Sequence, residues 1–206
     1  MLKPFVSAVA FVLALTGFAA APARAEVTPD ALVRQISNDV LDAVKADKAI
    51  QAGDVGRIIA LVDAKVMPNV NFEVMTRSAV GPQWRGASAE QRSRLQSEFK
   101  TLLVRVYSGA LTQVKDQTVE IMKTLPVQGS TQVVVQSEVR GKGEPIKLDY
   151  RLDKFDAAWK IIDVNVGGIW LVQSYRSQFS PVLANGGVPA LIDRLADQNK
   201  ANAGKS

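Results

Sequence analysis

The sequence predicts an α+β fold in which helices pack on a four-stranded antiparallel sheet. In the first half of the chain, and again near its end, apolar residues recur every three or four positions, which is the period of an amphipathic helix. Between these regions the period falls to two, which is typical of strands with one buried face. Helices grouped before and after a run of strands indicate an α+β fold rather than an alternating α/β fold.

The N-terminus reads as a secretory signal peptide. Lys3 gives a short positive start, residues 5–21 are almost entirely apolar, and residues 23–25 (Ala-Arg-Ala) offer an A-x-A cleavage site. The apolar run is shorter than the roughly 20 residues that a membrane-spanning helix needs. We therefore expect residues 1–25 to be cleaved and the product to be exported and soluble.

The first helices are predicted from caps and apolar stripes. Thr28 followed by Pro29 matches an N-cap and a first helical position. A second helix is expected to begin at Asp54 and to stop before Pro68. A shorter helix over residues 71–81 should end at a Gly-Pro pair. In the first helix an apolar residue recurs at every fourth position, at Leu32, Ile36, Val40 and Val44.

A long helix beginning after Ser88 is the best defined. Ser88 and Gln91 form a capping-box pattern, in which each side chain bonds the backbone N–H of the other residue. The residues that follow place a broad apolar stripe along the helix, wide enough to cover a sheet. The stripe consists of Leu95, Phe99, Leu102, Leu103, Val106, Tyr107, Ala110 and Leu111.

Four strands are expected near residues 117–124, 131–140, 145–154 and 158–166. The turns between them are short, which favours an antiparallel meander with one covered face and one wet face. In the third strand the predicted inward side chains are Ile146, Leu148, Tyr150 and Leu152. In the fourth strand Ile162, Val164 and Val166 should point inward, and Asp163 and Asn165 should point out to solvent.

The pair Gly167-Gly168 follows the last strand. A dinucleotide-binding turn would need a third glycine and backbone N–H groups converging at a helix start, and this sequence lacks that third glycine. We interpret the pair as a corner that sets Ile169, Trp170 and Leu171 beside the apolar face of the sheet.

The C-terminal part should contain two helical segments, at about 169–184 and 187–199, divided by Gly186-Gly187. One domain over residues 26–198 is expected, because we find no internal repeat and no low-complexity linker. Residues 199–206 should form a loose tail.

Two missing residue types exclude whole classes of chemistry. The sequence has no cysteine and no histidine, which excludes disulfides, Ser-His-Asp and Cys-His catalysis, and histidine-dependent zinc sites. Asp149, Asp153 and Asp156 are interleaved with Lys147 and Arg151, so we interpret them as a charged surface ladder rather than a metal site. No acid lies within an apolar stripe, so the sequence nominates no catalytic residue, no metal site and no cofactor.

Charge is unevenly distributed along the chain. Residues 77–115 contain seven basic and two acidic side chains, whereas residues 26–54 contain three basic and six acidic ones. The basic segment is either an ordinary solvated surface or a flank that meets phosphate head groups or acidic proteins. An exported protein meets no genome, so nucleic-acid binding is not expected.

Three stretches in this order resemble the MlaC family of periplasmic phospholipid-binding proteins, also known as toluene-tolerance auxiliary components of an ABC transport system. They are "SAVGPQWRGASAEQRSRLQSEFKTLLVRVYSGAL", "YRLDKFDAAWKIIDVNVGGIWLVQSYRSQF" and "GGVPALIDRL". The resemblance covers about Val27 to Leu195. Trp170 departs from it, because a small residue is expected there, so the mouth of the pocket should be shaped differently.

The resemblance implies a cone-shaped fold related to nuclear transport factors, in which a curved sheet and helices enclose a deep apolar cavity. Phospholipid tails would fill the cavity and the head group would stay outside. The protein would be a periplasmic monomer without enzymatic activity, and it would ferry lipid between an outer-membrane lipoprotein complex and an inner-membrane ABC transporter complex.

The lipid-binding residues are predicted from the inward faces of these elements. They are Phe72, Met75, Leu103, Val106, Tyr107, Leu111, Tyr150, Leu152, Ile162, Val164, Val166, Ile169 and Tyr175. Patterning alone does not separate a hollow core from a filled one. Two alternatives to the carrier therefore remain: a protein-binding adapter with a filled core, and an enzyme that acts on a small molecule through one buried carboxylate.

Overall fold

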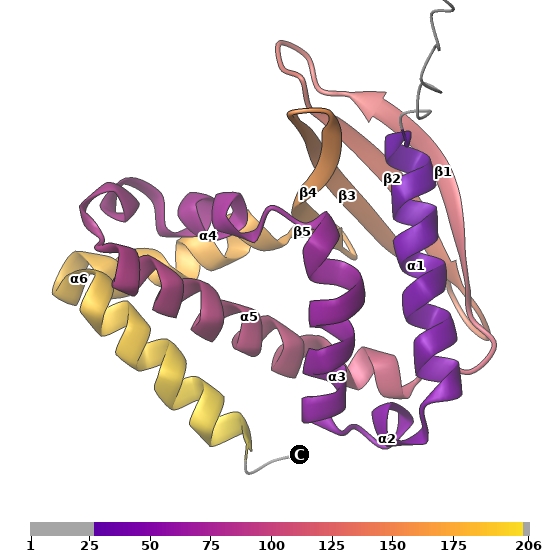
Figure 1. Cartoon of the computed structure of the whole chain (residues 1–206), viewed down its shortest axis with the longest axis horizontal. Coiled ribbons are helices and arrows are strands. Elements are labelled where there is room, and N and C mark those ends of the chain that lie inside the picture. Colours follow the sequence, from indigo (N-terminus) through magenta and orange to yellow (C-terminus); the bar gives the residue numbers. More distant parts are fainter. Residues whose placement is uncertain (1–26, 204–206) are drawn as a thin grey trace, which may run out of the picture.

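A computed structural model describes residues 27–203, in which five α-helices precede the strands along the chain and one long helix follows them (Figure 1). The expected signal peptide, residues 1–25, lies outside these residues. The α+β organisation predicted from the sequence is confirmed.

The first helices begin where their caps predict. Helix α1 spans Pro29–Ala46, although the Thr28 side chain itself makes no capping bond. A short helix that was not predicted, α2 (Lys48–Gln51), is capped by Asp47, which accepts hydrogen bonds from the N–H groups of Ala49 and Ile50. Helix α3 (Val55–Leu61) is capped by Asp54. It continues into a π-helical turn, η1 (Val62–Val66), and a 3-10 turn, η2 (Met67–Asn69). The expected stop before Pro68 is wrong, because the α-helix itself ends at Leu61 and Pro68 lies in the first positions of η2, where a proline is tolerated.

The middle helices also follow their sequence patterns. Helix α4 spans Phe72–Val80 and ends at Gly81, whose φ of 73° lies in the left-handed region. A 3-10 turn, η3 (Gly81–Gly86), leads to helix α5 (Ala89–Thr112). The capping box of Ser88 and Gln91 is present at the start of α5. This prediction is confirmed.

The sheet has one strand more than expected. Strands β1 (Thr118–Pro126), β2 (Val133–Arg140), β3 (Ile146–Phe155) and β4 (Ala158–Val166) form the predicted antiparallel meander, and β5 (Ile169–Trp170) pairs with the end of β4. The four-stranded prediction missed β5 because a strand of two residues shows no alternation.

The last helix, α6 (Leu171–Ala203), is broken at Gly187, whose φ is 67°. The two predicted segments are therefore its two halves, except that Ile169 and Trp170, expected at the start of the first segment, form β5. The loose tail expected from residue 199 is not what the structure shows as far as residue 203, because α6 continues to Ala203. Asn199 is buried there, and its amide donates hydrogen bonds to the backbone and the carboxylate of Glu98. Asparagine and lysine dominate this stretch, so nothing in the sequence indicated the contact.

Helices cover one face of the sheet, which we call the inner face. Helix α1 lies on β1 and β2, and α4 and α6 lie against β4 (Figure 1). Val33 and Ile36 of α1 form one core with the inner-face residues Val135, Leu152 and Ile161. A second core joins α4, α5 and α6 around Phe99, and a third joins α1, α3 and α5 around Val44 and Ile58.

Candidate functional site

Apolar side chains remain exposed where the second half of α5 and the β4–β5 end of the sheet approach the core of α4, α5 and α6. Leu103 of α5 and Val166 of β4 pack on that core. The neighbouring apolar side chains are open to solvent: Val106 is 52% exposed, Tyr107 36% and Ile169 61%. Residues of this kind are normally buried, so a group of them left open is a candidate binding surface.

The same surface extends onto the third strand. Leu148 is the register partner of Val166, and Ile146, two residues before it on the same face, is 55% exposed. The sequence placed both on the inward side of the strand but did not nominate them for the site. Their alternation with Lys147 and Asp149 was the pattern that could have found them. We call Leu103, Val106, Tyr107, Ile146, Leu148, Val166 and Ile169 the inner apolar surface.

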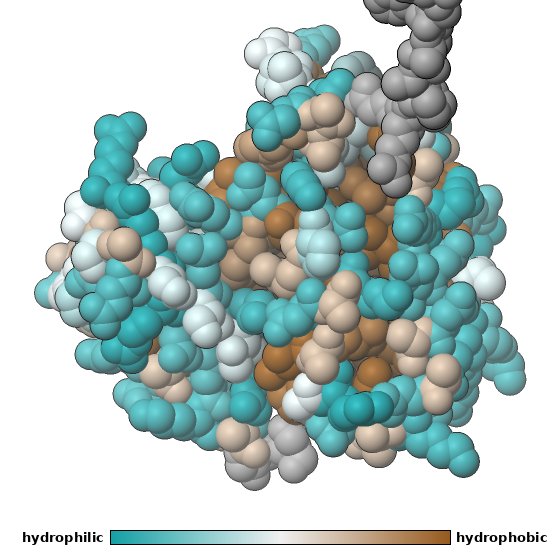
Figure 2. Space-filling model, viewed as in Figure 1, coloured by the Kyte–Doolittle hydropathy of each residue, from teal (hydrophilic) through white to brown (hydrophobic). Residues whose placement is uncertain are grey.

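Figure 2 shows hydrophobic surface on both sides of α3, in the region between α4 and α5 on one side and α1 with the sheet on the other. Polar residues cover most of the remaining surface in that view. The helices that α5 packs against within residues 27–203 are chiefly α6, α3, α4 and α2 rather than the strands. The inner face of the sheet and the exposed side of α5 are therefore not packed together.

Several predicted site residues are closed core in this structure. Phe72, Met75 and Tyr175 are at most 7% exposed in the core of α4, α5 and α6. Tyr150 and Leu152 belong to the core under α1, and Leu111 packs on the core of α1, α3 and α5. Val164 contacts the first two cores and so lies between them. Twelve of the thirteen residues are thus divided among three cores and one open surface, and Ile162 is the exception.

Ile162 does not take the inward position that alternation predicts. Leu152 pairs with Ile161 and Arg151 pairs with Asp163, so Ile162 is the extra residue of a β-bulge. Ile161 occupies the inner face instead and packs in the core with Leu152. Two consecutive isoleucines fit either register, so the sequence could not distinguish them.

The site tyrosines are desolvated. Burial and the nearby Tyr107 hydroxyl raise the pKa of Tyr175 to about 12. Burial also raises the pKa of Tyr107 and of Tyr150, although a hydrogen bond to Ser37 of α1 partly opposes the shift at Tyr150. The surroundings of these rings therefore favour neutral groups.

The prediction that Asp163 and Asn165 reach solvent is wrong. They point to the outer face as alternation requires, yet each is only 6% exposed. Burial raises the pKa of Asp163, and its hydrogen bonds from the N–H groups of Val172 and Val164 oppose the shift. Because Asp163 lies on the face opposite the inner apolar surface, it offers no general base to a molecule bound there.

The glycine pair is a corner, as predicted. Gly167 and Gly168 have φ values of 59° and 95° and form the two-residue turn between β4 and β5. Two positive φ values are what a tight hairpin of the mirror-image type requires. Ile169 and Leu171 follow on the inner side, but Trp170 lies on the outer face with its ring 4.6 Å from Arg151 Cζ. Trp170 therefore does not shape the mouth of the inner apolar surface.

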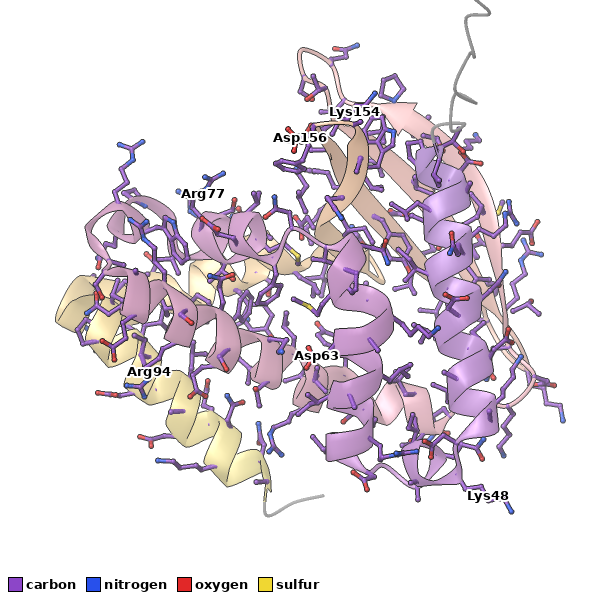
Figure 3. The ribbon with its side chains drawn as sticks, viewed as in Figure 1. Lys48, Asp63, Arg77, Arg94, Lys154 and Asp156 are labelled. Carbon is purple, nitrogen blue, oxygen red and sulfur yellow. The ribbon has the colours of Figure 1, made fainter. Side chains whose placement is uncertain are left out.

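The basic segment is partly used within the fold. Lys100 of α5 pairs with Asp63 of η1 at 2.7 Å, and Arg92 stacks on Trp84 and donates to two backbone carbonyls. Figure 3 places Arg77 and Arg94 among α4, α5 and α6, and Lys48 on α2 at the other end of the molecule. These contacts favour the ordinary surface interpretation for Lys100 and Arg92.

Two surface hollows, of about 560 and 240 Å³, lie along the second half of α6. Their linings include Arg194 and Asp197 in the first and Glu90, Arg94 and Asp193 in the second. Neither is the enclosed apolar cavity that the resemblance implies. Within residues 27–203 no cluster of acidic residues could hold a metal ion, and none of the helices there is long and apolar enough to cross a bilayer.

The chain is similar to proteins of known function. The model of one family, described as MlaC protein, matches residues 34–197. The intermembrane phospholipid transport system binding protein MlaC of Haemophilus influenzae is 24% identical over 177 residues, which cover 84% of this chain and 83% of that protein. The toluene tolerance protein ttg2D of Pseudomonas putida is 24% identical over 161 residues, which cover 78% of this chain and 75% of that protein.

A solved structure has the same fold. The phospholipid-binding protein from Ralstonia solanacearum, solved in complex with a phospholipid, superposes with a TM-score of 0.80 at 38% sequence identity, over 84% of this chain and 98% of that one. The family model spans most of the residues described, and the structural match confirms the helices and the antiparallel sheet. The resemblance seen in the sequence is thus confirmed, and the chain belongs to the MlaC family.

Proposed function

We propose that this protein is a periplasmic phospholipid carrier that holds the acyl tails of its cargo against the inner apolar surface and leaves the head group in water. It belongs to a family of lipid-binding carriers, not of enzymes. The observation that carries the proposal is the exposure of Val106, Tyr107, Ile146 and Ile169 between two parts of the molecule that do not pack together. The phospholipid bound to the similar Ralstonia solanacearum protein supports the same cargo.

The tails enter between α5 and the inner face of the sheet. Tyr107 and Ile169 are already open, whereas Val164 and Tyr175 lie one layer deeper, in contact with the core of α4, α5 and α6. Phe72, Met75, Tyr150 and Leu152 form the walls behind this opening, and Leu103 and Val166 belong to the inner apolar surface itself. Leu111, on the core of α1, α3 and α5, and Ile162, at the bulge, lie outside the site. A tail that lies between the two parts covers apolar side chains that are otherwise exposed, so the walls lose no apolar burial.

The energetics suit a carrier. Burying one methylene contributes about 0.8 kcal/mol, so two acyl chains with roughly 30 methylenes gain more than about 20 kcal/mol on leaving water. Leaving a bilayer costs a similar amount, so transfer from membrane to protein is nearly neutral. The direction of transport therefore comes from partner proteins and from ATP hydrolysis elsewhere.

The partners we propose are an outer-membrane lipoprotein complex and an inner-membrane ABC transporter complex. The name of the Haemophilus influenzae relative places that protein in an intermembrane phospholipid transport system, which supports partners at both membranes. Cleavage of residues 1–25 would deliver the domain of residues 26–198 to the space between them as a monomer. We expect no cofactor, and the phospholipid is the cargo.

The test is to place a charge on the inner apolar surface. Tyr107→Glu and Val106→Glu put a carboxylate where the tails lie, and both positions are exposed enough for the variants to fold. We expect each to lower the phospholipid recovered per protein, after incubation with vesicles and organic extraction, by about tenfold or more. The matched control is Leu125→Glu, at an apolar position of β1 that is 43% exposed.

Leu125 is the register partner of Val134 on the outer side of the sheet, so the control should carry as much lipid as the wild type. Wild-type loading by Tyr107→Glu and Val106→Glu would place the tails elsewhere. A wild-type protein that takes up no phospholipid would contradict the proposed function itself.

A further inference from the structure

Four residues on the outer face of the sheet fix the direction in which the chain leaves β4 and enters α6. We call Arg151, Asp163, Asn165 and Trp170 the outer-face cluster. Asp163 and Asn165 alternate along β4, Arg151 is the register partner of Asp163 on β3, and Trp170 is the register partner of Asn165 on β5. The cluster thus joins three neighbouring strands on the side away from the inner apolar surface.

Asp163 serves as the N-cap of α6 from a neighbouring strand. Its Oδ1 accepts a hydrogen bond of 3.0 Å from the N–H of Val172, the second residue of α6, and one of 2.8 Å from the N–H of Val164. The residue just before α6 is Trp170, which cannot accept such a bond. The first turn of α6 is therefore fixed to β4 by one buried carboxylate nine residues earlier.

Asn165 holds the turn itself. Its Oδ1 accepts a hydrogen bond of 2.8 Å from the N–H of Gly168. The N–H of Gly167 donates to the carbonyl of Lys147 on β3. Two side chains and one strand carbonyl thus bind three successive points of the returning chain, at residues 167, 168 and 172.

Arg151 and Trp170 cover the capping carboxylate. The guanidinium of Arg151 lies 4.6 Å from the centre of the Trp170 ring, and its charge acts on Asp163. Arg151 Nε is buried without a hydrogen-bond partner, and the guanidinium lies over the Trp170 ring. This cover explains why Asp163 and Asn165 are buried on a face that should be wet.

The helix that is fixed in this way borders the site. Leu171 and Tyr175 in the first turns of α6 are buried in the core with Phe99, and Leu103 of the inner apolar surface packs against the same core. Acyl tails that widen the opening would move this part of α6 relative to the sheet. The hydrogen bond between Asp163 and Val172 resists that movement.

We propose that the outer-face cluster is a positioning device that sets how firmly the protein retains its lipid, with Asp163 as the residue that holds α6 against the sheet. This inference rests on the proposed carrier function. The cluster touches no lipid. It acts through the first turn of α6.

The experiment measures the release of a fluorescent phospholipid. The full mature protein is loaded with NBD-labelled phosphatidylethanolamine and mixed with acceptor vesicles of phosphatidylethanolamine and phosphatidylglycerol, and the release rate is recorded. Asp163→Ala removes the capping acceptor, so release should be about fivefold faster or more, the factor expected for one lost helix cap. Asp163→Asn keeps an oxygen at Oδ1 but loses the charge that acts on Arg151, so its release rate should lie between those of the wild type and Asp163→Ala.

The matched control is Asp47→Ala. Asp47 also accepts hydrogen bonds from two backbone N–H groups at a helix start and contacts an arginine, Arg57, but it lies at α2. This variant also loses a capped helix start, yet it should release lipid at the wild-type rate. Equal release rates for Asp163→Ala and Asp47→Ala would overturn the inference.

A second variant covers the case in which Asp163→Ala does not fold. Trp170→Ala removes the cover from Arg151 and Asp163 without touching the backbone bonds, and it should release lipid faster than wild type but more slowly than Asp163→Ala. A wild-type rate for Trp170→Ala would also contradict the inference. A wild-type protein that takes up no labelled lipid would show instead that the proposed function has failed.

Discussion

Phe99 of α5 and Tyr175 of α6 meet edge to face, with their ring centroids 4.9 Å apart. Phe99 also contacts Phe72 of α4 and Phe179 of α6, and it is 1% exposed. One ring thus joins all three helices that form the wall beside the site.

Removing this ring should destabilise the protein strongly. We expect Phe99→Ala to lower the free energy of unfolding by about 3–5 kcal/mol, because the substitution leaves a large cavity among three helices. Urea denaturation followed by circular dichroism measures the change. The control Val106→Ala lies on the same helix but is half exposed, and it should change the free energy by less than about 1 kcal/mol. Similar losses in both variants would contradict this account of the core.

The tyrosines predict how stability depends on alkaline pH. The pKa of each of the three, Tyr107, Tyr150 and Tyr175, is raised in the folded protein, to about 12 for Tyr175. The folded state therefore binds these protons more tightly than the unfolded state does. The contribution of the three hydroxyls to the free energy of unfolding is complete below the ordinary pKa of 10.0, and it is lost as the pH rises through the pKa values of the folded protein.

Two measurements check this expectation. The absorbance of tyrosinate should appear well above pH 10 while the protein is folded, and circular dichroism should show unfolding over the same range. Tyr175→Phe removes one ionisation and should move the unfolding midpoint to higher pH. Tyrosinate absorbance that rises near pH 10 in the folded protein would contradict the burial of these hydroxyls.

Glycine is required at the Gly167-Gly168 corner by the backbone conformation and not by crowding around the Cβ position. No atom lies within 4 Å of a Cβ built at Gly168, yet its φ is 95°. Gly168→Ala should therefore lower the free energy of unfolding by about 1–2 kcal/mol through backbone strain alone. Gly109 in α5 has equally open surroundings and no positive φ, so Gly109→Ala should stabilise the protein by roughly 0.5–1 kcal/mol. Thermal unfolding of the two variants gives the sign of each effect.

Asn199 should contribute to stability although it lies near the end of the chain. Asn199→Ala removes the hydrogen bonds to Glu98 and should lower the free energy of unfolding by about 1–3 kcal/mol. Asp197→Ala, two residues earlier and highly exposed, should change it by less than about 0.5 kcal/mol. If both variants unfold at the wild-type urea concentration, the end of α6 is not docked on α5.

Features that depend on neighbours in the sequence could be predicted. The capping box at Ser88 and Gln91, the cap at Asp54 and the end of α4 at Gly81 are all confirmed, because each involves residues within four positions. The alternation of β3 correctly assigned its two faces for the same reason.

Features that depend on distant segments could not be predicted. Asp163 and Asn165 are buried because Trp170 and the start of α6 return over them, and Asn199 is buried because α5 lies beside it. The bulge at Ile162 is decided by how β4 pairs with β3. The helical period also placed Tyr107 and Phe99 in the same apolar stripe of α5, whereas packing leaves Tyr107 exposed and buries Phe99.

The most direct test of the carrier account is to purify the exported protein without detergent and to measure its mass under native and denaturing conditions. The account predicts a native mass that exceeds the chain mass by bound phospholipid, which is lost on denaturation and identified in the organic extract. A native mass equal to that of the bare chain, unchanged after incubation with phospholipid vesicles, would contradict the account and favour a filled core that serves a protein-binding adapter.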